Sequence, residues 1–163
     1  MDERALRNAS YDVNLAKEKY EYSVFIKWLE ENGWNYEVNP ENSDKNIHGS
    51  DITIWKLPEH KMEIDLKGCQ RKYDNVALSY ERSYDGIKWF PTLHENKITT
   101  HFIFIDEVGN IFCIAYDDVR LRFHSYEQRT AKTDLAGHHN KVLLIPKKSL
   151  NCLRAIRRRI IVN

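Results

Sequence analysis

Cysteines and long apolar runs are scarce in this chain of 163 residues. The three cysteines, Cys69, Cys113 and Cys152, lie far apart and form no CxxC pair. Their odd number and spacing favour reduced thiols in a cytoplasmic setting over a disulfide framework or a zinc ribbon. No apolar run approaches the roughly 18 residues that a transmembrane helix needs, and residues 1–10 are polar and charged. We therefore expect a soluble, intracellular protein.

An excess of one charge is also missing, because 25 Lys and Arg residues stand against 24 Asp and Glu residues. The net charge of +1 argues against a surface that binds polyanions or membranes over its whole area, so any basic site must be local. The chain has no glycine-rich phosphate loop. His48 and His101 lack the nucleophile and orienting acid of a catalytic triad. "GHHNK", residues 137–141, fits a loop better than a metal site.

The residues that are present fit one folded domain. The apolar fraction of 42% and the aromatic fraction of 12% are those of a globular protein. The length allows one sizeable core but no second full domain, so we expect residues 1–163 to form a single domain. Apolar residues at helical spacing predict a helix over residues 11–32 that ends at Gly33.

Alternating apolar residues predict that most other elements are strands. The expected strands are residues 34–39, 50–55, 61–67, 74–80, 100–106, 110–116 and 141–146. A polar loop is expected over residues 40–50, a short helix around "PTLHENK" at residues 91–97, and a C-terminal helix in "SLNCLRAIRRRI" with Ser149 as its N-cap. This order predicts an α/β fold in which a mixed sheet is flanked by helices.

The hairpin "DITIWKLPEHKMEIDLKG", residues 51–68, carries Glu63, Asp65 and Lys67 on one face of its second strand. A solvated surface strand explains these charges through cross-strand pairs worth a few tenths of a kcal/mol. The hairpin would also bring Asp51 toward Asp65, and like charges about 4 Å apart repel by about 4 kcal/mol at an effective dielectric constant of about 20. A divalent cation between the carboxylates offsets this repulsion, and Mg²⁺ takes such oxygen ligands.

Glu21 is a second unusual acid. It precedes apolar residues of the predicted helix by three, four and seven positions, so it lies on or beside the apolar stripe. Acidic side chains rarely face a core unless they are paired. Glu21 therefore either pairs with Lys17 or Arg71 at the edge of the stripe or reaches the charged hairpin as a further acid.

Four residues carry a resemblance to a known family: Glu21 in the helix, Asp51 in "GSDITI", and Asp65 with Lys67 in "EIDLKG". This pattern resembles the PD-(D/E)XK nuclease superfamily, and its spacing is most similar to the branch of archaeal Holliday junction resolvases and restriction-endonuclease-like proteins. The resemblance covers about residues 15–70, with Ser50 in place of the usual proline before the first aspartate. It implies a restriction-endonuclease-like core with β-rich additions.

The resemblance implies an endonuclease that hydrolyses phosphodiester bonds in nucleic acid, above all DNA, with RNA not excluded. Its cofactor would be Mg²⁺, for which Mn²⁺ can substitute. The implied metal ligands are Asp51, Asp65, the backbone carbonyl of Leu66, Glu21 and Glu63. The implied catalytic residues are Asp51, Asp65, Lys67 and Glu21. Lys67 would orient the attacking water or stabilise negative charge on the phosphate. Many such enzymes pair their active sites as homodimers, although the sequence shows no self-complementary surface.

A basic and polar segment directly after the motif is the expected nucleic-acid contact. It comprises Gln70, Arg71, Lys72 and Tyr73, with Arg82 slightly further along. A solvated turn is the alternative for each of these residues. A second candidate phosphate patch, or else an ordinary exposed helix face, comprises Arg154, Arg157 and Arg158. The near-neutral net charge argues against a dedicated junction resolvase that clamps long duplex DNA through its phosphates.

Two other classes of protein stay open on the sequence alone. One is a catalytically inactive nucleic-acid-binding or protein-interaction domain on the same fold, and an absence of Mg²⁺ or Mn²⁺ binding would favour it. The other is an unrelated β-rich interaction domain whose alternating charges form only a solvated surface. This last class predicts that Asp51 and Asp65 lie far apart in space, beyond the reach of one shared cation.

Overall fold

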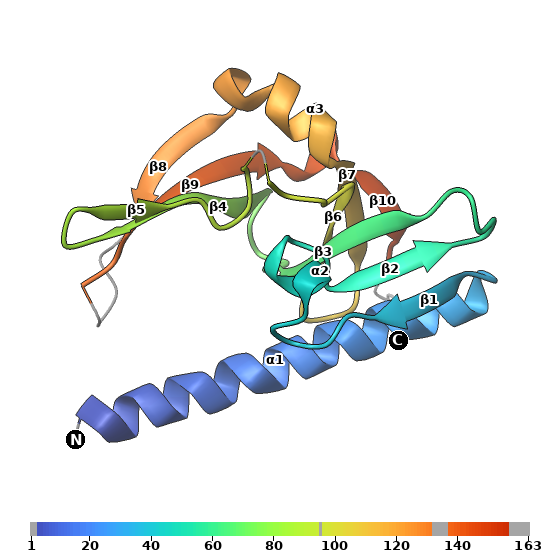
Figure 1. Ribbon diagram of the computed structural model, residues 1–163, viewed down its shortest axis with the longest axis horizontal. Helices are drawn as coiled ribbons and strands as arrows, with labels where there is room; N and C mark the ends of the chain where they lie inside the picture. The colour runs from blue at the N-terminus through green and yellow to red at the C-terminus, as the bar shows by residue number, and fades with distance from the viewer. Residues whose placement is uncertain (1–2, 95, 132–136, 157–163) are drawn as a thin grey trace, which may run out of the picture.

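A computed structural model describes residues 3–94, 96–131 and 137–156, with side chains from residue 15 onward. One long helix, α1 (Glu3–Glu31), crosses one face of a six-stranded sheet, and a four-stranded sheet extends beside it (Figure 1). The predicted helix is confirmed, although it begins earlier than expected. Gly33 follows it with a φ of 74°, the left-handed conformation that a helix C-terminus favours.

The six-stranded sheet has the spatial order β1-β2-β3-β6-β7-β10. Its strands are β1 (Asn35–Val38), β2 (Ile52–Trp55), β3 (Met62–Gly68), β6 (His101–Ile105), β7 (Ile111–Ala115) and β10 (Asn151–Arg154). β3 and β6 run parallel, and the other neighbouring pairs are antiparallel. The sheet is therefore mixed, and the predicted β2–β3 hairpin is confirmed.

The four-stranded sheet is antiparallel throughout and has the order β5-β4-β9-β8. Its strands are β4 (Asn75–Tyr84), β5 (Ile87–Trp89), β8 (Glu127–Ala131) and β9 (His139–Pro146). The shorter helical segments are α2 (Asp44–Ile47), α3 (Tyr116–Leu121), and 3-10 turns at Phe123–Ser125 and Lys147–Ser149. α2 lies within residues 40–50, where the sequence predicts only a polar loop.

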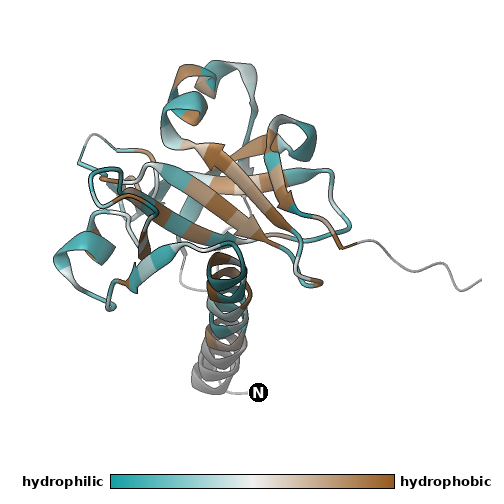
Figure 2. Ribbon diagram, turned by 90° about the vertical axis from the view of Figure 1, so that its right-hand side faces the viewer, coloured by the Kyte–Doolittle hydropathy of each residue, from teal (hydrophilic) through white to brown (hydrophobic). Residues whose placement is uncertain are grey.

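Two apolar cores lie on opposite faces of the six-stranded sheet. The core beneath α1 is formed by Phe25, Leu29, Ile52, Ile54, Ile64, Leu66, Ile103, Ile105 and Ile111. The core shared with the four-stranded sheet and α3 is formed by Val76, Leu78, Phe102, Phe104, Ile114, Tyr116, Val119, Leu143, Ile145 and Leu150. Because β6 contributes to both cores, its residues are nearly all apolar, and the hydrophobic strands at the centre of Figure 2 follow from this burial.

The mixed α/β class is confirmed, and a second sheet lies beside a short helix on one face of the six-stranded sheet. One face carries α1, and the other carries the second sheet with the short α3. Buried residues alternate along part of β4 and β9, so each of these strands has one apolar face. These apolar faces pack against the six-stranded sheet.

The expected C-terminal helix is wrong where the structure describes it. Residues 151–154 form β10, because β7 offers an edge for hydrogen bonding and Leu153 packs against the core beneath α1. Ser149 lies in a 3-10 turn rather than at the start of an α-helix. Residues 157–160 of the expected helix lie outside the described residues.

The short helix expected around residues 91–97 is also absent among its described residues. Long-range contacts hold this segment in an irregular path instead. Thr92 is 2% exposed, and its hydroxyl donates a hydrogen bond to the carbonyl of Ser79. The hydroxyl of Tyr116 donates to the carbonyl of His94 over 2.9 Å. These contacts outweigh the local helical propensity of the segment.

Candidate functional site

The candidate site lies at the edge of β3 where its neighbour β2 stops. Ile52 pairs with Ile64, and the backbone N–H of Asp51 donates to the carbonyl of Ile64 over 2.8 Å. β3 continues past this pair to Gly68, with β6 along its other side. The edge of β3 beyond Ile64 is therefore open to side chains instead of a neighbouring strand.

The side chain of Asp51 occupies this open edge. Its Oδ2 accepts a hydrogen bond from the backbone N–H of Leu66 over 2.8 Å, and its Oδ1 accepts one from Nδ2 of Asn46 over 3.1 Å. The N–H and C=O groups of one strand residue point to the same side of the strand. The carbonyl of Leu66 consequently faces the region that the Asp51 carboxylate also faces.

Asp65 and Lys67 approach this region from the face of β3 that is turned away from α1. Asp65 is 8% exposed, and its Oδ1 lies 3.1 Å from Nζ of Lys67. Burial, and next the negative charge of Asp65, raise the pKa of Asp51 to about 6, while the N–H of Leu66 and the charge of Lys67 oppose this increase. The hydrogen bond from the N–H of Leu66 places the Asp51 carboxylate beside the residue that follows Asp65, so the structure brings the two aspartates to the same part of β3, as the hairpin predicts.

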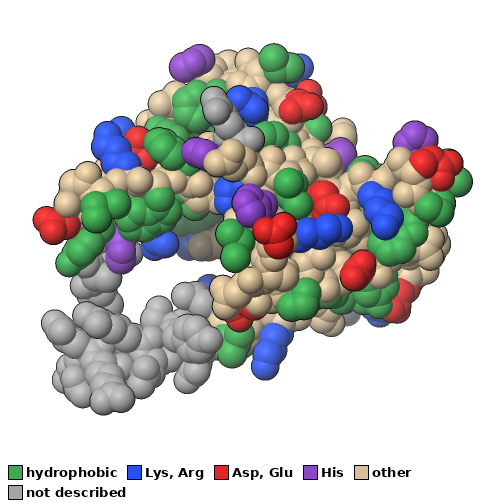
Figure 3. All heavy atoms as spheres, in the orientation of Figure 1, with side chains coloured by type: hydrophobic (Ala, Val, Ile, Leu, Met, Phe, Trp, Pro, Cys, Tyr) green, Lys and Arg blue, Asp and Glu red, His purple; other side chains and the backbone are tan. Residues whose placement is uncertain are grey.

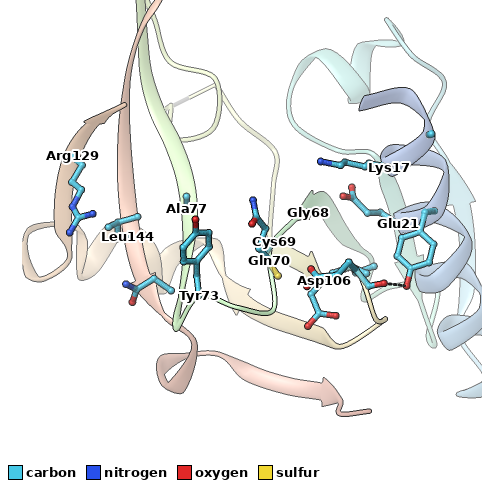
Figure 4. A pocket seen from close by; sticks show the side chains of 15 residues that line it. Lys17, Glu21, Gly68, Cys69, Gln70, Tyr73, Ala77, Asp106, Arg129 and Leu144 are labelled. Carbon is cyan, nitrogen blue, oxygen red and sulfur yellow. Dashed lines mark hydrogen bonds between the residues drawn. The ribbon is translucent and has the colours of Figure 1, made fainter. Parts of the chain in front are cut away.

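Glu21 lies on the side of α1 that faces the end of β3 (Figure 4). A Cβ atom at Gly68 would collide with its carboxylate, so the absence of a side chain at Gly68 makes room for Glu21. Burial, and next the charge of Glu18, raise the pKa of Glu21 to about 7; Asp51 adds to the increase and Lys67 opposes it. The structure thus brings Glu21 to the same region as the two aspartates.

Glu63, one of the expected metal ligands, belongs to a polar network with Ser50, Thr53 and Lys45. Its Oε2 accepts hydrogen bonds from the hydroxyls of Ser50 over 2.5 Å and Thr53 over 2.7 Å. Its Oε1 lies 3.4 Å from Nζ of Lys45. Ser50 and Thr53 are fully buried, so their hydroxyls need an acceptor. Glu63 therefore anchors the segment between β1 and β2.

Three further residues lie near the candidate site but are not predicted from the sequence. Asn46 in α2 binds Asp51, although its segment looks like a loop of turn-forming residues. Burial, and next the charge of Asp51, raise the pKa of Tyr22. Burial lowers the pKa of Lys97, and the charges of Asp65 and Asp51 oppose this decrease. Tyr22 follows Glu21 directly, but Lys97 is far away in the sequence and no motif marks it.

The donor set of the site fits a weakly coordinated Mg²⁺ ion. Within residues 3–94, 96–131 and 137–156, no group of three or more His, Cys, Asp and Glu side chains is arranged to hold a metal ion. Asp51 and Asp65 supply two carboxylate side chains, and the carbonyl of Leu66 adds one backbone oxygen. Mg²⁺ is usually held by one or two carboxylates and keeps several waters, whereas structural zinc needs a closed shell. The mutual repulsion of the two carboxylates favours such a cation.

A cleft of about 1160 Å³ opens beside Glu21 and Gly68. α1 forms one wall and the four-stranded sheet forms the other (Figure 4). In the space-filling view, the molecule is hollowed between the lobe that carries the four-stranded sheet and the helix (Figure 3). Basic and acidic side chains are interspersed over the face drawn there, which agrees with the near-neutral net charge.

Some of the residues predicted to bind nucleic acid line the cleft, and others do not. Gln70 and Tyr73 line the cleft. Nζ of Lys72 lies 5.0 Å from the centre of the Tyr73 ring. The backbone N–H of Arg71 donates to the Glu107 carboxylate, with distances of 3.0 and 3.1 Å to its two oxygens.

Two other basic residues of the prediction lie elsewhere. Arg82 is in β4, opposite Asn140 of β9, and is not among the residues that line the cleft. Arg154 is in β10 rather than on a helix, and Arg157 and Arg158 of the second candidate patch lie outside the described residues. In "GHHNK", only Gly137, with a φ of 83°, and His138 precede β9; residues 139–141 form the start of this strand, so the loop expected there is wrong for these three residues.

The remaining expectations concern cysteines and membrane spans. Cys69, Cys113 and Cys152 are free thiols. None of the described helices has the length and hydropathy to cross a membrane. No family model, curated protein or solved structure matches this chain.

Proposed function

We propose that this chain is a Mg²⁺-dependent endonuclease of the PD-(D/E)XK type that hydrolyses phosphodiester bonds in DNA. The proposal depends above all on the open edge of β3, where the Asp51 carboxylate binds the N–H of Leu66 and lies beside Asp65. Lys67 completes this set through its contact with Asp65. Neighbouring carboxylates and an ammonium group are the residue types that metal-assisted phosphodiester hydrolysis uses.

The fold supports the proposal at a coarser level. A restriction-endonuclease-like core would need a mixed sheet, a hairpin that carries the acids and a helix beside them, and the arrangement of β2, β3 and α1 is compatible with such a core. The free cysteines favour an intracellular setting, where a nuclease would meet its substrate. Mn²⁺ is expected to replace Mg²⁺, since both accept oxygen ligands.

Each residue of the site has a distinct part in this chemistry. When bound, Mg²⁺ supplies positive charge that polarises the scissile phosphate and favours ionisation of a water molecule. Asp51, Asp65 and the carbonyl of Leu66 would hold the ion. Lys67 would orient the attacking water or neutralise charge on the phosphate, and its ion pair with Asp65 over 3.1 Å holds its ammonium group in position. Glu21, with a pKa of about 7, can hold or release a proton near neutral pH.

A cleavage assay with Mg²⁺ and Mn²⁺ tests the proposal. Single-stranded, duplex and branched DNA and RNA are incubated with the wild type, Asp65→Ala and Lys67→Ala. We expect each substitution to lower the cleavage rate about 100-fold or more, because each removes charge that acts on the transition state. Lys88→Ala, which changes an exposed lysine in β5, is the matched control and should retain the wild-type rate.

Two outcomes would contradict the proposal. Full metal-dependent cleavage by Asp65→Ala would place the activity elsewhere, including in a contaminating nuclease. Binding of nucleic acid without cleavage, together with no Mg²⁺ or Mn²⁺ binding by calorimetry, would identify the chain as a catalytically inactive binding domain on the same fold.

A further inference from the structure

The cleft beside α1 is continuous with the candidate site, because Glu21 and Gly68 belong to both. Its volume of about 1160 Å³ slightly exceeds that of pockets for one small molecule, which span about 300–1,000 Å³. In a continuous duplex the bases are paired and stacked on one another, so they are not available to enter such a cleft. The volume therefore suits a few unpaired nucleotides.

Exposed aromatic rings lie on two sides of the cleft. Tyr73, between β3 and β4, is 54% exposed and stands beside Ala77 (Figure 4). Tyr20 on α1 is 40% exposed, and its hydroxyl donates a hydrogen bond to the carbonyl of Glu107 over 3.1 Å. Aromatic rings at the surface of a groove are the platforms on which unpaired bases stack.

Cationic side chains reach the cleft from both walls. Lys17 extends from α1, and Arg129 extends from β8 on the opposite wall (Figure 4). Both are exposed, and Nε of Arg129 lies 2.8 Å from Oε1 of Glu127. A single strand of DNA offers phosphates to cationic side chains and bases to aromatic rings. The cleft has both kinds of side chain in its lining.

Two acids of the lining are already engaged within the protein. The carboxylate of Asp106 accepts hydrogen bonds from the backbone N–H groups of Val108 and Asn110 and from the side chain of Asn110. The carboxylate of Glu107 accepts the backbone N–H of Arg71. These hydrogen bonds hold both carboxylates against the protein, while the ion pair of Arg129 with Glu127 lies at the exposed surface, where a phosphate can compete for the guanidinium group.

We propose that the cleft binds a short unpaired stretch of DNA beside the scissile bond. The substrate is then a single strand, or a duplex with a single-stranded branch, rather than continuous duplex. Bases stack on Tyr73 and Tyr20, and Lys17 and Arg129 contact phosphates. The assignment of a substrate rests on the proposed nuclease activity, whereas the binding of a single strand does not.

Binding is tested in the full chain carrying Asp65→Ala, so that cleavage does not interfere. The probe is a fluorescent oligothymidylate of about 12 nucleotides, followed by anisotropy, and a duplex of equal length is the comparison. We expect the single strand to bind about tenfold more tightly than the duplex. Adding Tyr73→Ala should weaken single-strand binding about fivefold or more, the effect of one lost base stack.

The salt dependence separates phosphate contacts from stacking. Adding Arg129→Ala to the same background should reduce the slope of log K against log salt by about 0.7, the effect of one lost phosphate contact in a single strand. Tyr73→Ala should leave that slope unchanged. Tyr84→Ala and Arg122→Ala are matched controls at exposed residues outside the lining of the cleft, and both should bind like the parent.

The outcomes distinguish this inference from the proposed function. Equal affinity for single strand and duplex, or unchanged affinity after Tyr73→Ala, would overturn the inference. Cleavage of continuous duplex by the wild type as fast as branched DNA would also overturn it, while supporting the nuclease proposal. Tight single-strand binding that depends on Tyr73, without cleavage by the wild type, would support the strand-binding cleft and contradict the nuclease.

Discussion

At the scale of single residues, Asp51 destabilises the fold when no cation is bound. Burial and the charge of Asp65 raise its pKa from 3.8 to about 6. The folded protein therefore holds the proton more tightly than the unfolded chain does. The resulting stabilisation is fully present below pH 3.8 and is lost as the pH rises through about 6.

Asp51→Asn should remove this dependence on pH. With EDTA present, the variant should be more stable than the wild type above pH 6 by a few kcal/mol, and the two should converge below pH 3.8. The Asn oxygen can still accept the N–H of Leu66, but its NH2 group replaces the oxygen that accepts from Asn46, so the Asn46 amide must reorient. Thermal unfolding across this pH range measures the difference. If the variant is less stable than the wild type over the whole pH range, the negative charge of Asp51 does not destabilise the folded state.

Gly68 illustrates how a missing side chain shapes the site. A Cβ atom there meets the carboxylate of Glu21, which is the mobile end of a long side chain. Gly68→Ala should therefore displace Glu21 and lower the cleavage rate, while the free energy of unfolding changes by less than about 1 kcal/mol. Kinetics and chemical denaturation measure the two effects.

A double-mutant cycle is the control for Gly68→Ala. In the Glu21→Ala background the collision is absent, so Gly68→Ala should cost little further activity. Equal losses in both backgrounds would show that Gly68 acts by another route, such as direct contact with the substrate.

At the scale of elements, the segment between β1 and β2 is held by the network around Glu63. Asn39, Ser50 and Thr53 are buried, and Nδ2 of Asn39 donates to the hydroxyl oxygens of Ser50 and Thr53 over 2.9 and 3.2 Å. Asp51 directly follows this network. The position of the Asp51 carboxylate at the edge of β3 therefore depends on polar contacts that the hairpin itself does not provide.

Glu63→Ala should act on stability and not on the metal site. It removes the acceptor for two buried hydroxyls, so we expect a loss of about 1–3 kcal/mol in the free energy of unfolding. Mg²⁺ affinity, measured by calorimetry below the unfolding temperature, should stay within about twofold of wild type. Glu59→Ala, at an exposed position between β2 and β3, is the control. If Glu63→Ala lost Mg²⁺ affinity without a change in stability, Glu63 would be a metal ligand.

At the scale of the whole molecule, the site and the cleft join three layers. Glu21 comes from α1, Asp65 comes from β3 of the six-stranded sheet with Asp51 directly before β2, and Arg129 comes from the four-stranded sheet. The two apolar cores hold these layers together on either side of β6. The candidate catalytic residues lie on the middle layer and its helix, whereas the second sheet contributes only to the cleft.

Local patterns in the sequence determined much of this architecture. Helical spacing and Gly33 predict α1, alternation predicts β2 and β3, and short apolar runs predict β6, β7 and β9, because these signals act between residues near in sequence. The motif residues Glu21, Asp51, Asp65 and Lys67 were likewise visible as unusual charges. Packing between distant segments decided the rest. Residues 151–154 pair with β7 as a strand instead of forming a helix, and Leu153 packs against the core beneath α1. The charges of Asp65 and Asp51 act on Lys97, which comes from a remote loop. The hydrogen bonds of Glu63 with Ser50 and Thr53, and the cleft between α1 and the second sheet, also depend on contacts between distant segments. No local sequence pattern encodes such contacts.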